Sequence, residues 1–374
     1  MNRVSSQYLK PSISIAIPTY NEAEHIASVL RSFLASDYDN IVEILVADGG
    51  SQDDTRAIVE QLSLEDRRIK LIHNPYKIQA TALNLALEQS KGEIFLRADA
   101  HCDYAPDYVE QCIRALQQSQ AINVGGAQRF VATNHVQAGI SLASKSFLGS
   151  GGAKYRNPEY NGFAETVFLG CFWRKYLADI SGYNPSSTPN EDAELNLRLT
   201  NLEPKAIYIS SQIKAWYYPR KTWGGLFQQY FKYGKSRYQT FRKHPQKSQL
   251  RGKLPFIALI ILISILVWDL SFIEIDLPLK GLLSAIAAIP FIESLRLNWQ
   301  YKKSFTREIW RGKLTQKPSF LLRWLQCGIA IFTMNLAHAL GYGYQLLNYR
   351  CQWLLSFIYT PSAKKITQAL DSRS

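Results

Sequence analysis

Short apolar runs and amphipathic segments alternate along the first hundred residues. Four runs have the length and composition of buried strands: 12–17, 41–47, 70–73 and 93–98. Three segments between them carry apolar residues at helical spacing: 23–34, 54–62 and 80–89. Strands that alternate with helices predict a parallel sheet with helices on both faces, and such sheets bind ligands beyond the carboxyl ends of their strands.

Polar residues gather at these strand ends, in Pro18–Glu22, Asp48–Asp54 and Asp99–His101. The chain has no phosphate-cradling GxxxxGK loop, and no GxGxxG follows the first strand. No set of Ser, His and Asp stands out as a nucleophilic triad. The strand ends offer carboxylates instead, which argues against ordinary ATP-dependent or hydride-transfer chemistry.

Three apolar stretches lie in the last third of the chain, at 254–268, 279–292 and 320–347. A helix needs about 20 apolar residues to cross a bilayer. The first stretch reaches that length only if it is extended, the second is shorter, and the third contains Arg323 and His338. Each could enter a membrane, or each could be a buried helix of a soluble domain.

The charge is distributed unevenly. Residues 1–200 carry 18 Lys/Arg and 23 Asp/Glu, whereas 201–374 carry 25 and 7. Between Lys205 and Lys253 there are twelve basic residues and no acidic one. Lys/Arg beside apolar segments mark the cytoplasmic side of a membrane. The first two apolar stretches are therefore predicted to form a hairpin with its turn, 274–278, outside and both ends in the cytosol. A basic surface can also bind nucleic acid, but the apolar runs in the same half favour a membrane, and no nucleic-acid partner is expected.

Several motifs resemble the family 2 inverting glycosyltransferases, which have the GT-A fold. They follow in the family's order: Ile17–Glu22, Val46–Thr55, Leu83-Asn84, Gly92–Ile94, Arg97–His101 and Asn190–Asp192. Asp99–His101, Trp216–Arg220 and Gln228–Gly234 are similar to the subgroup that builds succinoglycan-type exopolysaccharides. The resemblance covers about residues 12–240. It implies an α/β protein with a Rossmann-like mixed sheet, a GT-A domain at 1–250 and a helical membrane-associated region at 251–374.

The resemblance also implies a donor site. Tyr20 would lie against the nucleotide base, Pro18, Thr19 and Glu22 would line the base and ribose, and Asp48 would accept the uracil imide proton. The alternative for Asp48 is a turn-forming Asp-Gly. Asp53 and Asp54 are interpreted as structural residues at the start of a helix.

Asp99-Ala100-His101 occupies the place of the family's Asp-x-Asp. Strand alternation points Asp99 and His101 the same way, so both could bind a divalent cation that bridges the diphosphate. The histidine makes Mn²⁺ more plausible relative to Mg²⁺. The alternative for His101 is a hydrogen-bonded histidine at a strand end.

By resemblance, Asp192 is the catalytic base and Glu191 contacts the acceptor; alternatively, both acids stabilise a helix N-terminus. Lys232 would meet the diphosphate, and Gln229 and Tyr233 the acceptor sugar. The alternative for this segment is an amphipathic helix on the membrane.

These features predict an inverting, metal-dependent hexosyltransferase at the inner membrane. It would be multi-pass with a cytoplasmic catalytic domain, and it would move a hexose from a nucleotide sugar, by resemblance a UDP sugar, to a lipid-linked saccharide. Two alternatives stay open: a sugar nucleotidyltransferase, and a non-catalytic membrane scaffold derived from a transferase.

Overall fold

The computed structural model of the chain describes residues 10–187, 190–243, 252–271 and 279–359. They fold into two compact units. The first is made of Met1–Lys221 and Pro290–Ile331, and the second of Thr222–Ile289 and Phe332–Ser374. The expected boundary between residues 250 and 251 lies outside the described residues, so the division into 1–250 and 251–374 stays a prediction.

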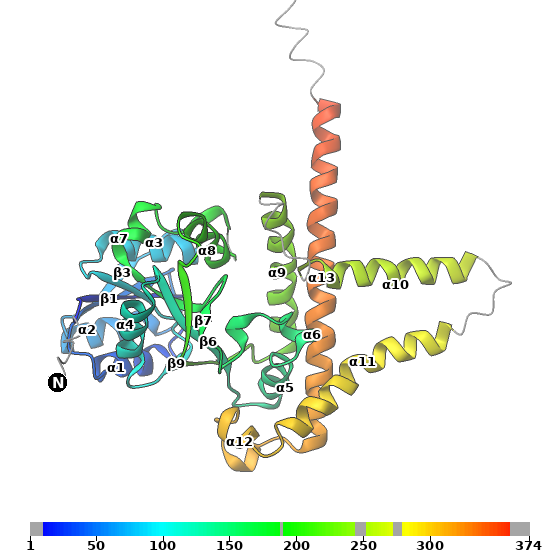
Figure 1. Ribbon diagram of the computed structural model, residues 1–374, viewed down its shortest axis with the longest axis horizontal. Coiled ribbons are helices and arrows are strands. Elements are labelled where there is room, and N and C mark those ends of the chain that lie inside the picture. Colours follow the sequence, from blue (N-terminus) through cyan, green and yellow to red (C-terminus); the bar gives the residue numbers. More distant parts are fainter. Residues whose placement is uncertain (1–9, 188–189, 244–251, 272–278, 360–374) are drawn as a thin grey trace, which may run out of the picture. The chain divides into compact units, whose positions relative to one another are not determined.

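A mixed sheet forms the centre of the first unit (Figure 1). Its strands in the described residues are β1 (Ile13–Thr19), β2 (Ile41–Asp48), β3 (Ile69–His73), β4 (Ile94–Arg97), β5 (Cys102–Tyr104), β6 (Asn123–Phe130), β7 (Gly162–Phe163), β8 (Phe168–Trp173) and β9 (Ile207–Tyr217). The strand order is β3-β2-β1-β4-β8-β6-β9-β5, and β7 pairs with β9. Strands β1 to β4 are parallel, as predicted, whereas β8 runs antiparallel to both β4 and β6.

Helices cover both faces of this sheet. The helices that lie entirely in the first unit, among the described residues, are α1 (Ile26–Leu34), α2 (Thr55–Glu65), α3 (Gln79–Gln89), α4 (Tyr108–Ser119), α5 (His135–Ala143), α6 (Phe147–Ser150), α7 (Arg174–Asp179), α8 (Glu191–Leu202) and α12 (Phe305–Glu308). The second part of α11 (Leu279–Gln300) and the first part of α13 (Phe320–Tyr359) also belong to it. Leu83 of α3, Leu177 of α7 and Leu199 of α8 share one buried core with Phe95 of β4. Helices α1 and α4 lie on the opposite face (Figure 1).

The predicted helix at 23–34 begins three residues late, at Ile26. Asn21 adopts a left-handed backbone with φ of 54°. The next two backbone amides are held by side chains from the start of α2 and the loop before it: Glu22 N–H donates to Thr55 Oγ1 at 2.8 Å, and Ala23 N–H donates to Asp53 Oδ2 at 3.1 Å. These contacts hold the chain out of the helix until residue 26.

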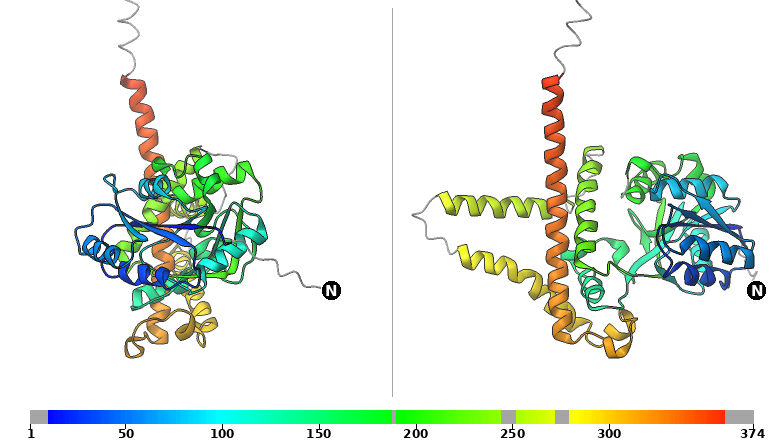
Figure 2. Two further views of the ribbon diagram at one scale, coloured as in Figure 1. Left: turned by 90° about the vertical axis from the view of Figure 1, so that its left-hand side faces the viewer. Right: turned by 180° about the vertical axis from the view of Figure 1, so that it is seen from behind.

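The second unit is helical. It contains α9 (Trp223–Lys243), α10 (Leu254–Ser271), the first part of α11 (Leu279–Gln300) and the second part of α13 (Phe320–Tyr359). The three predicted apolar stretches all lie in helices, as the views in Figure 2 show. The turn predicted at 274–278 lies outside the described residues.

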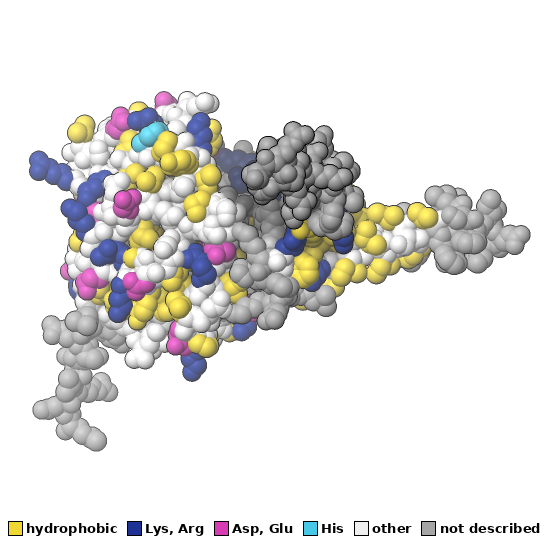
Figure 3. Space-filling model, turned by 90° about the horizontal axis from the view of Figure 1, so that it is seen from above, with side chains coloured by type: hydrophobic (Ala, Val, Ile, Leu, Met, Phe, Trp, Pro, Cys, Tyr) yellow, Lys and Arg dark blue, Asp and Glu magenta, His cyan; other side chains and the backbone are white. Residues whose placement is uncertain are grey.

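One helix in the described part of the chain, Phe320–Gln352, is long and apolar enough to cross a membrane, and 44% of its most apolar window is buried inside the protein. Helix α10 contributes a shorter apolar segment, Leu254–Ile265. Apolar side chains gather along the surface of α10 (Figure 3), including Leu254, Ile257 and Ile261. These findings weakly support membrane association.

Glycines allow α9 and α13 to cross closely within the second unit. A Cβ atom on Gly341 would lie 2.0 Å from the Phe231 carbonyl oxygen, and one on Gly234 would lie 2.1 Å from the His338 carbonyl oxygen. Since both neighbours are backbone atoms, neither side can move aside cheaply. The crossing therefore depends on the absence of side chains at these two positions.

We expect Gly341→Ala to destabilise the second unit by about 1–3 kcal/mol, because the added methyl group overlaps the backbone of α9. Gly224→Ala is the matched control, because a Cβ on Gly224 of α9 would have no heavy atom within 4 Å. Thermal unfolding in detergent measures both variants. Equal melting temperatures for the two would contradict the close crossing.

Candidate active site

The loops after β1 and β2 interlock at the carboxyl edge of the parallel strands. Asn21 N–H donates to Ser51 Oγ at 2.8 Å, and Gln52 N–H donates to Asn21 Oδ1 at 2.8 Å. Thr19 pairs with Asp48 in the sheet. The two predicted donor loops are therefore brought together, with the ring of Tyr20 exposed at their rim.

Asp48 is buried and shapes its own turn. Its carboxylate accepts hydrogen bonds from the backbone amides of Gly50 and Ser51, at 3.0 and 3.1 Å, and from the Ser51 hydroxyl. The turn-forming interpretation of this residue is confirmed. Its role toward a nucleotide base stays a prediction.

His101 faces the first loop. Its Nδ1 atom lies 2.9 Å from Glu22 Oε1. Burial opposes the charging of the ring, but the hydrogen bond to Glu22 and the charge of Asp99 outweigh it and raise the pKa of His101. The pair brings together two predicted site residues from different strand ends.

Asp99 and His101 fit a divalent cation that is shared with a ligand. A carboxylate oxygen and an imidazole nitrogen suit Mn²⁺, and the Nε2 atom of His101 is the ring nitrogen that Glu22 does not occupy. The described residues contain no group of three or more His, Cys, Asp or Glu side chains arranged to hold a metal. These two residues therefore do not complete a coordination shell, and diphosphate oxygens and water would have to supply the remaining ligands.

Arg97 joins the two halves of the predicted site. Its buried guanidinium forms an ion pair with Asp192 Oδ1 and lies 3.3 Å from Asp99 Oδ1. The Asp192 side chain is 40% exposed, so the pair opens to solvent on that side. Partial burial raises the pKa of the Asp192 carboxyl, and the charge and hydrogen bond of Arg97 oppose that increase.

Glu191 lies beneath this pair and is almost completely buried. With its amide oriented to satisfy both neighbours, Gln79 accepts from Arg97 Nη2 at 2.8 Å and donates to Glu191 Oε1 at 3.0 Å. Burial and the nearby charge of Asp192 raise the pKa of Glu191 to about 7. Glu191 and Asp192 are also the first residues of α8, so the helix-terminus interpretation holds structurally alongside any chemical role.

Tyr183 completes the cluster. Asn84 fixes its backbone: Asn84 Oδ1 accepts from Tyr183 N–H and Asn84 Nδ2 donates to the Tyr183 carbonyl, both at 2.8 Å. The phenol is buried, and the charges of Arg97, Asp192 and Glu191 all act on it. The cluster therefore draws on β4, α3, α8 and the segment that precedes α8.

The remaining predicted residues lie in the second unit. Gln229, Lys232 and Tyr233 are all on α9, where Gln229 Nε2 donates to the Tyr233 hydroxyl at 3.1 Å. Lys232 is exposed. Their contacts with a diphosphate or an acceptor stay predictions.

Comparison with known proteins identifies the family. The model of glycosyl transferase family 2 matches residues 14–177. Over 253 residues the chain is 34% identical to the succinoglycan biosynthesis protein ExoA of Rhizobium meliloti (strain 1021), which covers 67% of this chain and 76% of that protein. The chain belongs to glycosyltransferase family 2.

Two further similarities accompany this result. The transferase is 27% identical over 267 residues to a dolichyl N-acetyl-alpha-D-glucosaminyl phosphate 3-beta-D-2,3-diacetamido-2,3-dideoxy-beta-D-glucuronosyltransferase of Methanococcus voltae, covering 69% of this chain and 82% of that one. Its fold is similar to that of the mannosyltransferase PcManGT from Pyrobaculum calidifontis, with a TM-score of 0.55 and 17% identity over 91% of this chain and 88% of that one. The expected GT-A fold is confirmed. The family assignment supports glycosyl transfer in glycan synthesis over the nucleotidyltransferase and scaffold alternatives.

Sequence reasoning assigned no role to Arg97, Gln79 or Tyr183 of the transferase. For Arg97 a signal was present in the sequence, because Arg97, Asp99 and His101 stand at every second position. In the structure β4 ends at Arg97 and residues 100–101 form a turn, so the predicted strand alternation does not extend to His101. Gln79 and Tyr183 carry no local signal, because only the tertiary fold brings them to Arg97.

The raised pKa of Glu191 makes the stability of the transferase depend on pH. In the folded chain Glu191 stays mostly protonated up to about pH 7, whereas in the unfolded chain its carboxyl group loses the proton near pH 4.5. The free energy of unfolding should therefore fall by up to roughly 3 kcal/mol as the pH rises from 4.5 through 7. Glu191→Gln should remove that loss, as measured by denaturant unfolding at pH 5 and 8. Glu203→Gln, at the exposed end of α8, is the control. If Glu191→Gln loses as much stability between pH 5 and pH 8 as the wild type does, Glu191 is not the titrating group.

Proposed function

We propose that the chain is an inverting hexosyltransferase that uses a nucleotide sugar, a UDP sugar by the resemblance of its motifs, and a lipid-linked saccharide acceptor at the cytoplasmic face of the membrane. One observation carries the proposal. Arg97 pairs with both Asp192, the proposed base, and Asp99, the proposed diphosphate-side residue. One arginine would therefore position both the base and the carboxylate beside the leaving group.

Asp192 would act as general base. Its carboxylate would take the proton from the acceptor hydroxyl while that oxygen attacks the anomeric carbon and the bond to the nucleoside diphosphate breaks. One in-line displacement inverts the anomeric centre and requires no enzyme nucleophile. The surroundings that raise the pKa of Asp192 strengthen it as a base, while Arg97 favours its ionised form.

Asp99 and His101 would hold a divalent cation, Mn²⁺ or Mg²⁺, which neutralises charge on the departing diphosphate when bound. The name of the Pyrobaculum structure includes GDP-Man and Mn²⁺, which is consistent with this choice. Glu22 would orient the His101 ring through their 2.9 Å contact. Lys232 would add a further positive charge toward the diphosphate.

Donor recognition would fall to the interlocked loops. Tyr20, exposed at their rim, would stack on the base, Pro18, Thr19 and Glu22 would line the base and ribose, and Asp48 would accept the imide proton. On the acceptor side we propose Glu191, Gln229 and Tyr233. The name of the Methanococcus relative contains a dolichyl phosphate acceptor, which supports a lipid-linked acceptor here.

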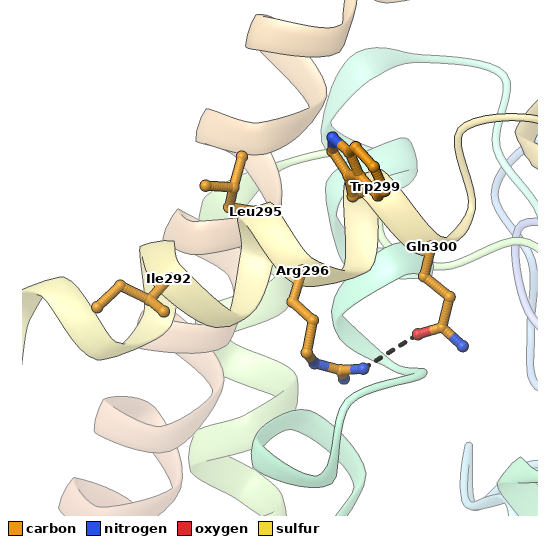
Figure 4. Close-up of a pocket in the computed structure, with 5 residues that line it drawn as sticks. All are labelled: Ile292, Leu295, Arg296, Trp299 and Gln300. Carbon is orange, nitrogen blue, oxygen red and sulfur yellow. Dashed lines mark hydrogen bonds between the residues drawn. The ribbon is translucent and has the colours of Figure 1, made fainter.

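The apolar helices support attachment to a membrane, and one surface of α11 has the composition of a membrane interface. Ile292, Leu295, Arg296, Trp299 and Gln300 line a pocket there (Figure 4). The Trp299 side chain is 74% exposed. Arg296 Nη1 donates to Gln300 Oε1 at 3.1 Å. Polar and apolar residues therefore alternate along this stretch of helix. Exposed Trp beside basic residues is typical of the lipid headgroup layer.

We expect Trp299 to contact lipid when the full chain is reconstituted in vesicles. Phospholipids brominated near the headgroup should quench part of the wild-type tryptophan fluorescence, and Trp299→Phe should lose that part. Trp216→Phe serves as a control, because Trp216 belongs to β9 of the central sheet. Equal quenching of the wild type and Trp299→Phe would exclude this contact.

A panel of nucleotide sugars tests the proposed function. The purified full chain is incubated with each radiolabelled donor, a membrane-lipid extract, and Mn²⁺ or Mg²⁺, and label is followed into the lipid fraction. We expect one hexose donor to label lipid with inversion at the anomeric carbon and to require the cation. Release of diphosphate from UTP and sugar phosphate would instead support the nucleotidyltransferase alternative, and inactivity with all donors would support the scaffold.

A further inference from the structure

Three buried polar atoms beside Asp192 have no hydrogen-bond partner among the described residues. They are Arg97 Nε, the Tyr183 hydroxyl and Glu191 Oε2. Their residues are 5%, 1% and 3% exposed. Each unpartnered buried polar group costs about 1–3 kcal/mol, so a fold that gathers three of them at one place leaves them for something that binds there.

The three groups are held by contacts of their own. Gln79 connects Arg97 to Glu191 through hydrogen bonds of 2.8 and 3.0 Å. Asn84 holds the Tyr183 backbone with two hydrogen bonds of 2.8 Å. These hydrogen bonds fix the positions of the three residues, so the unpartnered atoms are held in place before a ligand binds.

Their hydrogen-bonding types complement a hydroxyl group. Arg97 Nε–H can only donate, Glu191 Oε2 accepts when ionised and donates when protonated, and the Tyr183 hydroxyl can do both. A sugar hydroxyl also donates and accepts, whereas a methylene at the same place would satisfy none of the three atoms. We propose that Arg97, Tyr183 and Glu191 form a subsite that binds one ring hydroxyl of the transferred hexose; this inference rests on the proposed function.

The position of the subsite favours the transferred hexose over the acceptor, so this inference moves Glu191 from the acceptor side to the donor sugar. Arg97 is paired on one side with Asp99, at the proposed diphosphate, and on the other with Asp192, at the proposed attacking oxygen. The transferred sugar must lie between these two points. During the reaction its anomeric carbon loses its bond to the diphosphate oxygen, near Asp99, and gains a bond to the attacking acceptor oxygen, near Asp192. Asp192, with its partly exposed side chain, is where the cluster opens to the ligand.

The charge of the cluster restricts the class of sugar. One guanidinium, Arg97, faces three carboxylates: Asp99, Asp192 and Glu191. A hexuronate would bring a further negative charge toward a cation that is already paired twice, whereas a neutral hydroxyl adds none. The subsite therefore selects neutral hexoses and discriminates against uronic acids, in contrast to the donor named for the Methanococcus relative.

Monodeoxy donors test the subsite. With the donor identified by the panel, kcat/KM is measured for the parent sugar and for each monodeoxy analogue, in the wild type and in Tyr183→Phe. We expect the wild type to prefer the parent by about 100-fold at one ring position, since a site built to bind a hydroxyl rejects the analogue that lacks it. Tyr183→Phe should reduce that preference to below about 10-fold, at that position alone. The affinity for UDP, measured by calorimetry, should not change.

Tyr38→Phe is the matched control. Tyr38 is also buried, but its hydroxyl donates to the Pro11 carbonyl at 2.7 Å, so its removal should leave the deoxy profile unchanged. If Tyr183→Phe does not fold, Glu191→Gln takes its place in assays at pH 8, above the Glu191 pKa of about 7. There its amide replaces an accepting carboxylate with a donor and should weaken the same preference.

Two results would overturn the subsite while the proposed function stands. One is normal transfer with the same deoxy profile in the wild type and Tyr183→Phe, which would mean that the three atoms hold a buried water. The other is transfer of a hexuronate at the rate of the matching neutral hexose, where we expect at least about 100-fold slower transfer. If the wild type transfers no sugar at all, the proposed function fails and the subsite fails with it.

Discussion

An Asp192→Asn variant should fold and bind nucleotide but transfer sugar roughly 10²- to 10⁴-fold more slowly, the usual contribution of a general base. The amide has nearly the shape of the carboxylate and can still accept a hydrogen bond from Arg97, but it cannot take a proton from the acceptor. Single-turnover transfer from a labelled donor measures the chemical step, and calorimetry with UDP measures binding. A reduction in kcat with unchanged nucleotide affinity would identify a residue that acts in the transition state.

Asp179→Asn is the control for this variant. Asp179 is an exposed carboxylate on α7, so the same chemical change there should leave transfer within a factor of two. Near-normal transfer by Asp192→Asn would disprove the assigned base, and the carboxylates that share its network, Asp99 and Glu191, would be examined next.

The second large effect is expected at Arg97. Arg97→Met should destabilise the first unit by about 3–5 kcal/mol, because it leaves the carboxylates of Asp99 and Asp192 without their buried partner. Raising the pH should make the loss larger, since all the neighbouring carboxylates are then ionised. Denaturant unfolding at pH 5 and 8 measures the difference.

Arg198→Met provides the comparison. Arg198 also pairs with a carboxylate, Glu194, and donates to the Ile180 and Gly182 carbonyls, but its side chain is 28% exposed and it serves one acid rather than two. Its loss should therefore be clearly smaller. Equal losses for the two variants would mean that Arg97 is an ordinary structural arginine and does not neutralise the site.

The parallel half of the fold could be predicted from the sequence because its elements are local. The strand predicted at 41–47 is observed at Ile41–Asp48, and the helix predicted at 80–89 at Gln79–Gln89. The antiparallel half could not be predicted in this way. Strand β8 runs antiparallel to β4, and Ile94 lies opposite Trp173, so the pairing depends on residues far apart in the chain.

The candidate site divides in a similar way. The two donor loops and Asp99–His101 are found from strand ends, because parallel strands bring their carboxyl ends to one edge. The Asn84–Tyr183 contact spans 99 residues and has no local pattern. The sequence also could not show that Asp192 pairs with Arg97. An acid at a helix N-terminus is already stabilised by the helix dipole, so its presence there predicts no basic partner.

The segment from the end of β4 to the following turn also has a consequence for engineering. Arg97, Asp99 and His101 make the contacts of the site, while Ala98 and Ala100 between them are 0% and 2% exposed. A combinatorial library aimed at new donor specificity should therefore keep both alanines and this strand end intact, and vary residues that reach the sugar from other elements, such as Tyr183. An insertion or deletion of one residue here would displace His101 from Glu22 or Arg97 from Asp192, and so would break the contacts that join the two halves of the site.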